Sequence, residues 1–125
     1  MVEKKILLAE DDEMLASLLK FRLEKGGYAV SHARDGRQVK EYLESQKADI
    51  IISDIMMPYF SGIELVEFLR NELEDSTPVI IMSTAGNESN VLNAFEMGAD
   101  DFVSKPVSPS ELLVRVGKLL RQRAY

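Results

Sequence analysis

The sequence predicts an α/β domain: a doubly wound, five-stranded parallel sheet with helices on both faces, in three α/β/α layers. First, five short apolar segments are each followed by a segment with helical periodicity, which favours parallel βαβ units. Second, the apolar runs at 50–52 and 79–82 contain no polar residue, as expected of central strands buried on both faces. Third, 125 residues with 46% hydrophobic content suffice for a single core.

The first half of the chain carries two strand–helix units. Residues 6–9 are predicted to form a strand, and residues 13–25 a helix that ends at the Gly26–Gly27 pair, as at a C-terminal cap. Residues 28–33 form a weaker, more polar strand that we place at an edge of the sheet. The Asp35–Gly36 pair then turns the chain into a second helix. The residues expected to face the core from these two helices are Leu15, Leu18, Leu19, Leu23, Val39, Tyr42 and Leu43.

Three further units complete the pattern. The isoleucine strand at 50–52 precedes a third helix, and the strand at 79–83 precedes a fourth helix that ends at Gly98. A short last strand at 102–103 leads to the final helix. That helix opens with residues 108–111, Ser-Pro-Ser-Glu, the pattern of a capping box with proline at the first helical position. The residues expected to face the core from these helices are Ile63, Val66, Leu69, Leu73, Val91, Ala94, Phe95, Leu112, Leu113, Val116, Leu119 and Leu120.

The composition excludes several classes of protein. Without cysteine there is neither a disulfide framework nor a thiolate metal site. No apolar run approaches the length of a membrane span, and the N-terminus MVEKKILLAEDDE does not resemble a signal peptide. The net charge of −6, from 21 acids and 15 bases, disfavours nucleic acid as a direct ligand of this domain. We therefore expect a cytoplasmic protein without membrane contact.

Charged and hydroxyl side chains follow four of the predicted strands, at the point where each strand ends. In an open parallel sheet, ligand sites lie beyond the carboxyl ends of the strands, so these groups are expected to converge. A buried Asp54 needs a cation or hydrogen-bond donors nearby. Carboxylates beside a single ammonium group require a divalent cation, and oxygen ligands without His or Cys suit Mg²⁺. Three carboxylates, a hydroxyl and an ammonium group are expected to converge. The strands end in Glu10, Asp11 and Asp12 (first strand), Asp54 (third), Ser83 and Thr84 (fourth), and Ser104, Lys105 and Pro106 (fifth).

Several of these residues have an ordinary structural interpretation when they are taken alone. Asp12 is expected to cap the first helix, and an isolated Ser83 would hydrogen-bond to the backbone. The only histidine, His32, lies in the edge strand without a second ligand, and we interpret it as structural. The adjacent Met56 and Met57 are interpreted as packing filler. The functional interpretation depends on the joint placement, since one needed group follows each of four strands.

Four sequence motifs carry these residues: ILLAEDDE, IIISDIMMP with Gly62 following, PVIIMSTAG and GADDFVSKP. Together they resemble the receiver domain of response regulators, the phosphoacceptor half of two-component signalling. The resemblance covers essentially residues 1–125, which implies a single receiver domain with an ordered core at about 4–122. It also implies a flavodoxin-like fold with strand order 2-1-3-4-5.

The resemblance implies a role for each residue of the expected site. Asp54 is the aspartate that is phosphorylated, and Lys105, in a Lys-Pro pair that resembles the family's cis peptide, contacts a phosphoryl oxygen. Ser83 is the switch hydroxyl and Phe102 the switch aromatic. The ligands of Mg²⁺, or of Mn²⁺, are Glu10 through water, Asp11, Asp54 and the backbone carbonyl of Met56.

The resemblance also implies the partners and the mechanism. A sensor histidine kinase, a phosphotransfer protein or a small phosphodonor supplies the phosphoryl group, and the domain catalyses only its own phosphorylation and dephosphorylation. The phosphate draws in the Ser83 hydroxyl and turns Phe102 inward. These movements reshape the face of the fourth helix, fifth strand and fifth helix, which controls an unknown output partner. The domain is either a standalone regulator or the N-terminal half of a transcriptional regulator.

Two other classes of protein share parts of the pattern. A hydrolase of the haloacid-dehalogenase type also uses an Asp nucleophile with Mg²⁺ after a strand, but it needs a second Asp where this chain has Met56. A flavodoxin-like electron carrier shares the architecture, but it needs a Ser/Thr/Gly-rich phosphate loop after the first strand. The sequence EDDE at that place would repel a phosphate.

Two departures from the family pattern are Ser61 and the small pair Ala85–Gly86 after the switch hydroxyl. Neither touches the five residues that carry the expected chemistry, which are Glu10, Asp11, Asp54, Ser83 and Lys105. Ser61 stands where many members have Asp. Met56 and Ala85, two residues beyond the phosphoacceptor and the switch hydroxyl, have side chains that cannot orient a water molecule, which implies slow self-dephosphorylation.

The oligomeric state is suggested by a second resemblance. GADDF, followed by Glu111 and Arg115, resembles the dimerisation face of winged-helix transcriptional regulators, where Asp101 and Arg115 would pair across subunits. The fourth helix has Val91 and Asn93 where those relatives carry basic residues. We expect a monomer, or a weak dimer that depends on phosphorylation.

Overall fold

The computed structural model describes residues 3–123, so the last two residues of the ending KLLRQRAY lie outside it. One parallel sheet has the order β2-β1-β3-β4-β5, which confirms the predicted fold and strand order. The strands are β1 (Lys5–Ala9), β2 (Ala29–Ala33), β3 (Ile50–Asp54), β4 (Val79–Ser83) and β5 (Asp101–Ser104). The helices are α1 (Glu13–Lys25), α2 (Gly36–Ser45), α3 (Gly62–Glu67) with its π-helical continuation η1 (Phe68–Glu72), α4 (Glu88–Met97) and α5 (Pro109–Arg123).

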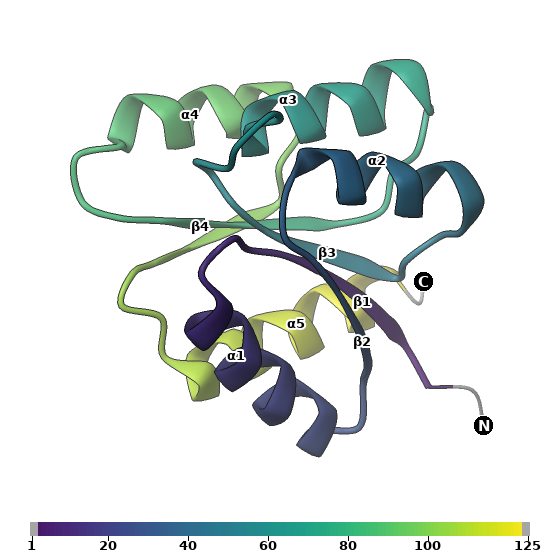
Figure 1. The fold of residues 1–125 in the computed structure, drawn as a ribbon, viewed down its shortest axis with the longest axis vertical. Helices are drawn as coiled ribbons and strands as arrows, with labels where there is room; N and C mark the ends of the chain where they lie inside the picture. The colour runs from purple at the N-terminus through teal and green to yellow at the C-terminus, as the bar shows by residue number, and fades with distance from the viewer. Residues whose placement is uncertain (1–2, 124–125) are drawn as a thin grey trace.

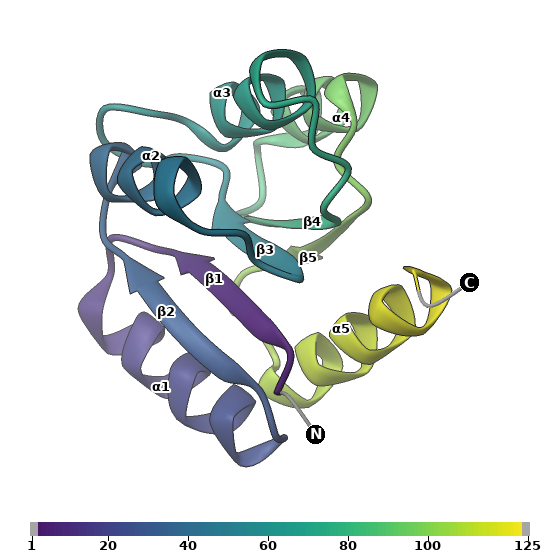
Figure 2. The same cartoon turned by 90° about the vertical axis from the view of Figure 1, so that its right-hand side faces the viewer.

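Helices cover both faces of the sheet in three layers. Helices α1 and α5 lie side by side on one face, and α2, α3 and α4 cover the other (Figures 1 and 2). The strand order reverses between β1 and β3, because the chain passes from β1 outward to β2 and then crosses to the other side of β1. Ligand sites of open α/β sheets lie beyond such a reversal, at the carboxyl ends of the strands.

The core is divided by the sheet into two apolar clusters. Successive strand residues point to opposite faces, so the apolar runs of β1, β3 and β4 supply both clusters. The cluster on the side of α1 and α5 includes Ile6, Leu8, Ile50, Ile52, Ile80, Met82, Leu19, Leu23, Leu112 and Val116. The cluster on the other side includes Leu7, Ile51, Ile81, Val39, Leu65, Leu69 and Ala94. The predicted burial of β3 and β4 on both faces is confirmed, and β1 is buried on both faces as well beyond Lys5.

The predicted helix ends agree with the structure at most positions. The Asp12 carboxylate accepts hydrogen bonds from the amides of Met14 and Leu15, which confirms it as the N-cap of α1. Asp35 caps α2 in the same way. Gly26 caps the end of α1 and Gly27 has a φ of 99°, a left-handed conformation that favours glycine.

The capping box expected at the start of α5 is only half formed. The Ser108 hydroxyl accepts a hydrogen bond from the Glu111 amide, with 3.3 Å between oxygen and nitrogen, and Pro109 is the first helical residue. The Glu111 carboxylate instead accepts from Arg115, one turn further along the helix. The Glu111 side chain is therefore paired with Arg115 and not with the backbone amide of Ser108, as a complete capping box would require.

Three residues expected in the core are exposed. Leu18 is 49% exposed. Ala16, Leu19 and Leu23 form the buried face of α1, and Leu18 is turned about 100° around the helix axis from Leu19, away from that face. Leu73 is 37% exposed for a different reason. Its amide donates to the Phe68 carbonyl five residues back, so the π-helical turn η1 shifts the helical phase.

The third exposed residue is Phe95 on α4, whose ring is 39% exposed and lies edge-on to the ring of Phe102. Val91 and Ala94 form the buried face of that helix, as predicted. No helix within residues 3–123 is both long and apolar enough to cross a membrane.

Candidate phosphoacceptor site

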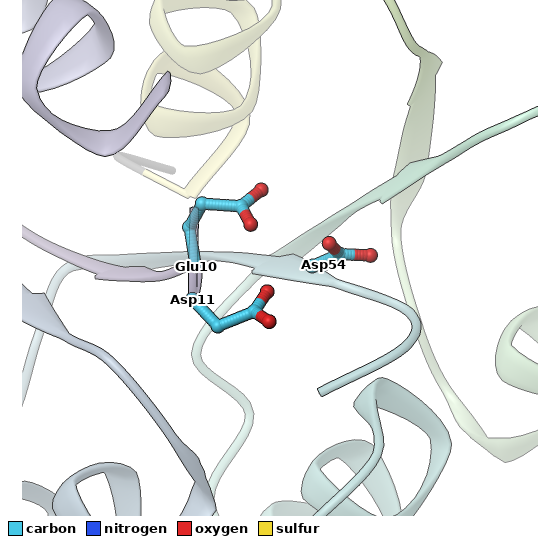
Figure 3. Close-up of side chains that lie close together, drawn as sticks. All are labelled: Glu10, Asp11 and Asp54. Carbon is cyan, nitrogen blue, oxygen red and sulfur yellow. The ribbon is translucent and has the colours of Figure 1, made fainter. Parts of the chain in front are cut away.

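Three carboxylates meet at the carboxyl ends of β1 and β3. Glu10 and Asp11 directly follow β1, and Asp54 is the last residue of β3. The carboxylates of Glu10 and Asp11 point toward that of Asp54 (Figure 3), and one oxygen from each residue lies within 4.8 Å of the others. Glu10 and Asp54 are buried, whereas Asp11 is exposed. The predicted acidic cluster is therefore assembled by the parallel register of two adjacent strands.

Lys105 supplies the positive charge of the cluster. It follows β5, and its ammonium nitrogen Nζ lies 2.6 Å from Asp54 Oδ2 and 2.8 Å from Glu10 Oε1. The peptide bond between Lys105 and Pro106 is cis, as the resemblance implied. One ammonium group faces three carboxylates, so the site keeps an excess of negative charge.

Burial and hydrogen bonds shift the pKa values of two groups in this cluster. Burial raises the pKa of the Glu10 carboxyl, and the hydrogen bonds from Lys105 and from the Asp12 amide only partly oppose that effect. Burial works against the charged form of Lys105, but its hydrogen bonds to Asp54 and Glu10 outweigh burial and raise the pKa of its ammonium group. Lys105 therefore stays charged at neutral pH.

The loop after β3 holds the Asp54 carboxylate from the other side. The Met56 amide donates to Asp54 Oδ1, with 3.0 Å between nitrogen and oxygen. Gly62, at the start of α3, approaches so closely that an added Cβ would lie 2.9 Å from the Asp54 carbonyl oxygen and from the Ile55 Cα. Its amide donates to the Ile55 carbonyl. Glycine is therefore required where the chain returns past the strand.

The predicted switch residues line a separate, open pocket. Ser83, the last residue of β4, is buried, and its hydroxyl donates to the Thr84 carbonyl at 3.1 Å rather than to the acidic cluster. Phe102 on β5 is 38% exposed, with its ring edge-on to Phe95 at 6.5 Å between centroids. A pocket of about 600 Å³ lies between these residues and α4, and Lys105 also lines it.

The sequence predicts structural roles for His32 and for Met56, and the structure agrees only with the first. His32 Nε2 lies 2.7 Å from the Glu10 carbonyl oxygen, so the histidine contacts backbone rather than a carboxylate, in agreement with its structural interpretation. The interpretation of Met56 as packing filler is wrong, because its side chain is 59% exposed while Met57 is buried. The Met56 amide is turned toward Asp54, and the Met56 side chain lies at the surface.

Ser61 carries a structural role that the sequence pattern contains but that we did not predict. Its hydroxyl accepts from the Glu64 amide, and the Glu64 carboxylate accepts from the Ser61 amide, which makes a complete capping box at the start of α3. The signal is Ser-x-x-Glu before an apolar helical stripe. Ser61 therefore caps the helix that follows the site.

Comparison with known families identifies the chain. The response regulator receiver domain family matches residues 6–117. The chain belongs to this family. The receiver domain is the signalling domain of two-component systems, and this result decides against the dehalogenase-type hydrolase and the flavodoxin-like electron carrier. Receiver domains bind Mg²⁺ and interact with histidine kinases and output domains.

Individual relatives agree with the family. The receiver domain is 36% identical over 121 residues to the alkaline phosphatase synthesis transcriptional regulatory protein PhoP of Bacillus subtilis, covering 97% of this chain and 50% of that protein. It is 37% identical to the phosphate regulon transcriptional regulatory protein PhoB of Pseudomonas aeruginosa, covering 98% of this chain and 54% of the relative. The chain thus spans about half the length of these transcriptional regulators.

Solved structures of receiver domains superpose on nearly the whole chain. The receiver domain of the Francisella response regulator 1452 matches with a TM-score of 0.89 and 35% identity, covering 97% of this chain and 99% of that one. A two-component response regulator from Clostridium difficile matches with a TM-score of 0.91 and 27% identity, covering 98% and 100%.

Proposed function

We propose that this receiver domain accepts a phosphoryl group on Asp54. The observation that carries the proposal is the position of its carboxylate, which is held by the Met56 amide on Oδ1 and by Lys105 on Oδ2, beside two further acids. An ionised carboxylate is already a nucleophile, so no general base is needed. Positioning and charge balance supply the catalysis.

Glu10, Asp11 and Asp54 would hold a divalent metal ion, Glu10 through water, and the Met56 carbonyl would be a further ligand. Their oxygens lie within 4.8 Å of one another, and a single lysine leaves their charge uncompensated. A donor set of oxygens alone suits Mg²⁺ or Mn²⁺. When bound, the ion neutralises charge on the transferring phosphoryl group and orients it.

The transfer step forms one bond and breaks one bond. An oxygen of Asp54 attacks phosphorus in line with the leaving atom, which is a histidine nitrogen when a histidine kinase or phosphotransfer protein is the donor. The nitrogen keeps the electron pair of the broken phosphorus–nitrogen bond and recovers its proton from solvent. Lys105 remains positively charged and balances the negative charge on a phosphoryl oxygen. The product is an acyl phosphate with close to two negative charges.

Ser83 and Phe102 convert the new charge into a change of surface. We propose that the Ser83 hydroxyl leaves the Thr84 carbonyl and donates to the phosphate, and that the Phe102 ring moves into the adjoining pocket. The pocket volume of about 600 Å³ supports this movement, because it exceeds the size of one aromatic ring. Phosphorylation can only shift an equilibrium that already exists between two conformations of the domain. The conformation with the Phe102 ring outward is therefore the unphosphorylated one of the two.

The remodelled face of α4, β5 and α5 is proposed to control an output protein or an effector domain. The relatives are transcriptional regulators about twice as long as this chain, which favours control of transcription over a standalone role. The domain itself is not expected to bind nucleic acid, because its net charge is −6.

Mass spectrometry of the intact protein tests the phosphoacceptor. After treatment with acetyl phosphate and Mg²⁺, the wild type should gain one phosphate and Asp54→Asn should gain none. Ser53→Ala is the matched control: Ser53 is buried next to Asp54, and its hydroxyl donates only to the Asp54 backbone carbonyl. Labelling of Asp54→Asn at a rate comparable to the wild type would refute the assignment.

A further inference from the structure

Tyr59, in the loop that follows Asp54, has an unusual backbone conformation. Its φ is 70°, in the left-handed region that bulky side chains rarely occupy. The ring is 71% exposed, so burial of the side chain does not hold the residue in place. A residue in such a conformation needs a specific contact that stabilises it.

The first turn of α2 provides this contact. The Arg37 guanidinium carbon lies 4.1 Å from the centre of the Tyr59 ring, within the range of a cation–π interaction. One turn along the same helix, the Lys40 ammonium lies 5.0 Å from the ring centre of Phe60, the next loop residue. Neither cation forms an ion pair with an acid among residues 3–123.

The backbone of α2 approaches the loop equally closely. The Gly36 amide donates to the Pro58 carbonyl, with 3.2 Å between nitrogen and oxygen. A Cβ at Gly36 would lie only 1.7 Å from the Cβ of Phe60, which is buried. Residues 36–40 of α2 therefore clamp residues 58–60 of the loop through one hydrogen bond, one close packing contact and two cation–π contacts.

The clamped loop begins at the phosphoacceptor. Only one residue, Met57, separates Pro58 from Met56, whose amide contacts Asp54 Oδ1. On the far side, Gly62 fixes the loop to Ile55. The position of Met56 therefore depends on both anchors, one at Gly62 and one at α2.

We infer that Arg37 is a positioning residue for the metal site: by stacking on Tyr59 it fixes the loop that presents Met56 to Asp54 and to the metal ion. The inference rests on the proposed role of the Met56 carbonyl as a ligand. The distinguishing feature is its dependence on Tyr59: a glycine at position 59 adopts a positive φ without steric strain, but it lacks the ring on which Arg37 stacks, so the Arg37 contact is already lost.

A double-mutant cycle on Mg²⁺ affinity tests the inference. Isothermal titration of the unphosphorylated protein with MgCl₂ would compare the wild type, Arg37→Ala, Tyr59→Gly and the double variant. We expect Arg37→Ala to bind Mg²⁺ roughly two- to fivefold more weakly, the range expected for loss of one exposed cation–π contact. In the Tyr59→Gly background the same substitution should have no effect.

Two controls separate positioning from stability and from the proposed metal site. Lys25→Ala removes a comparable exposed cation–π contact, on Phe21 of α1, and should leave Mg²⁺ affinity unchanged. The urea midpoint of Arg37→Ala should stay close to that of the wild type. Wild-type Mg²⁺ affinity in Arg37→Ala, or an equal loss in both backgrounds, would overturn the inference. Mg²⁺ binding that survives in Asp11→Asn would instead overturn the proposed metal site.

Discussion

Hydrolysis of an acyl phosphate on Asp54 requires a water molecule held in line with phosphorus, on the side opposite the aspartate. Met56 and Ala85 are the side chains best placed to hold it, and both are exposed. Neither can orient water: methionine has a weak sulfur acceptor and alanine has none. We therefore predict slow self-dephosphorylation, and faster loss of phosphate in Met56→Asn, Ala85→Glu and the double variant, up to roughly 10²–10⁴-fold.

Release of phosphate from the purified, labelled protein measures this rate. Leu92→Ala is a suitable control, because Leu92 is an exposed residue of the neighbouring pocket with no polar group to lose. A double variant that decays no faster than the wild type would mean that these two positions do not hold the water.

At the scale of single residues, the sequence was sufficient for the groups that follow strands. Glu10, Asp54 and Lys105 were placed together because parallel strands end at one edge of a sheet. The sequence was insufficient where a side chain's direction depends on a loop. The apolar character of Met56 suggests packing filler, but its amide is turned toward Asp54 and its side chain is exposed. No sequence pattern indicates the stacking of Arg37 on Tyr59, because Arg37 lies in α2 and Tyr59 in the loop after β3.

At the scale of elements, Arg70 in η1 ties three segments together at the end of the sheet opposite to the site. Its guanidinium donates to the carbonyls of Asp75, Thr77 and Gly98 and to the carboxylate of Asp100. The side chain is only 18% exposed. We predict that Arg70→Met lowers the free energy of unfolding by about 2–4 kcal/mol, because it leaves three part-buried carbonyls without donors.

Urea unfolding compares this variant with Arg34→Met. Arg34 pairs with Glu13 at the surface, with both side chains 65% exposed, and its replacement should cost less than about 1 kcal/mol. Phosphorylation of the folded Arg70→Met protein should be unchanged. Equal effects of the two substitutions on stability would show that the carbonyl contacts of Arg70 are not stabilising.

The type of each strand and α-helix, and their succession along the chain, follow from periodicity and cap residues. The order of the strands within the sheet comes instead from the resemblance to receiver domains, and the local deviations follow from neither. The π-helical turn η1 exposes Leu73, although the spacing of Leu73 from Leu69 and Val66 is that of a regular buried face. A sequence pattern assumes a constant number of residues per helical turn. It therefore cannot reveal the extra residue of a π-helical turn. The half-formed box at Ser108 fails for a similar reason, since Arg115 competes for the Glu111 carboxylate.

At the scale of the whole molecule, the contacts of Arg115 bear on self-association. Its guanidinium donates to both carboxylate oxygens of Asp101 in the same chain, each at 2.9 Å, and to Glu111 at 3.1 Å. A pairing of Asp101 and Arg115 across subunits would first have to break these contacts. Val91, at one of the positions that are basic in dimerising relatives, is buried. We predict a monomer before phosphorylation and at most a weak dimer afterwards.

Light scattering before and after treatment with a phosphodonor measures this change. Arg115→Ala should leave the unphosphorylated mass unchanged and should remove any phosphorylation-dependent increase. A tight dimer in the absence of phosphate would contradict the prediction.

The ion pairs of Lys105 also have a consequence for the newly made chain. They join Lys105 to Glu10, which lies 95 positions earlier in the chain, and to Asp54, which lies 51 positions earlier. The site therefore depends on the docking of β5, the last strand to be synthesised. Contacts of such long sequence separation form late in folding, because loop closure must precede them. A nascent or partly folded chain therefore has Asp54 without the lysine that balances a phosphoryl group. We therefore expect the proposed phosphoryl transfer to Asp54 to be disfavoured until β5 has docked and brought Lys105 to the site.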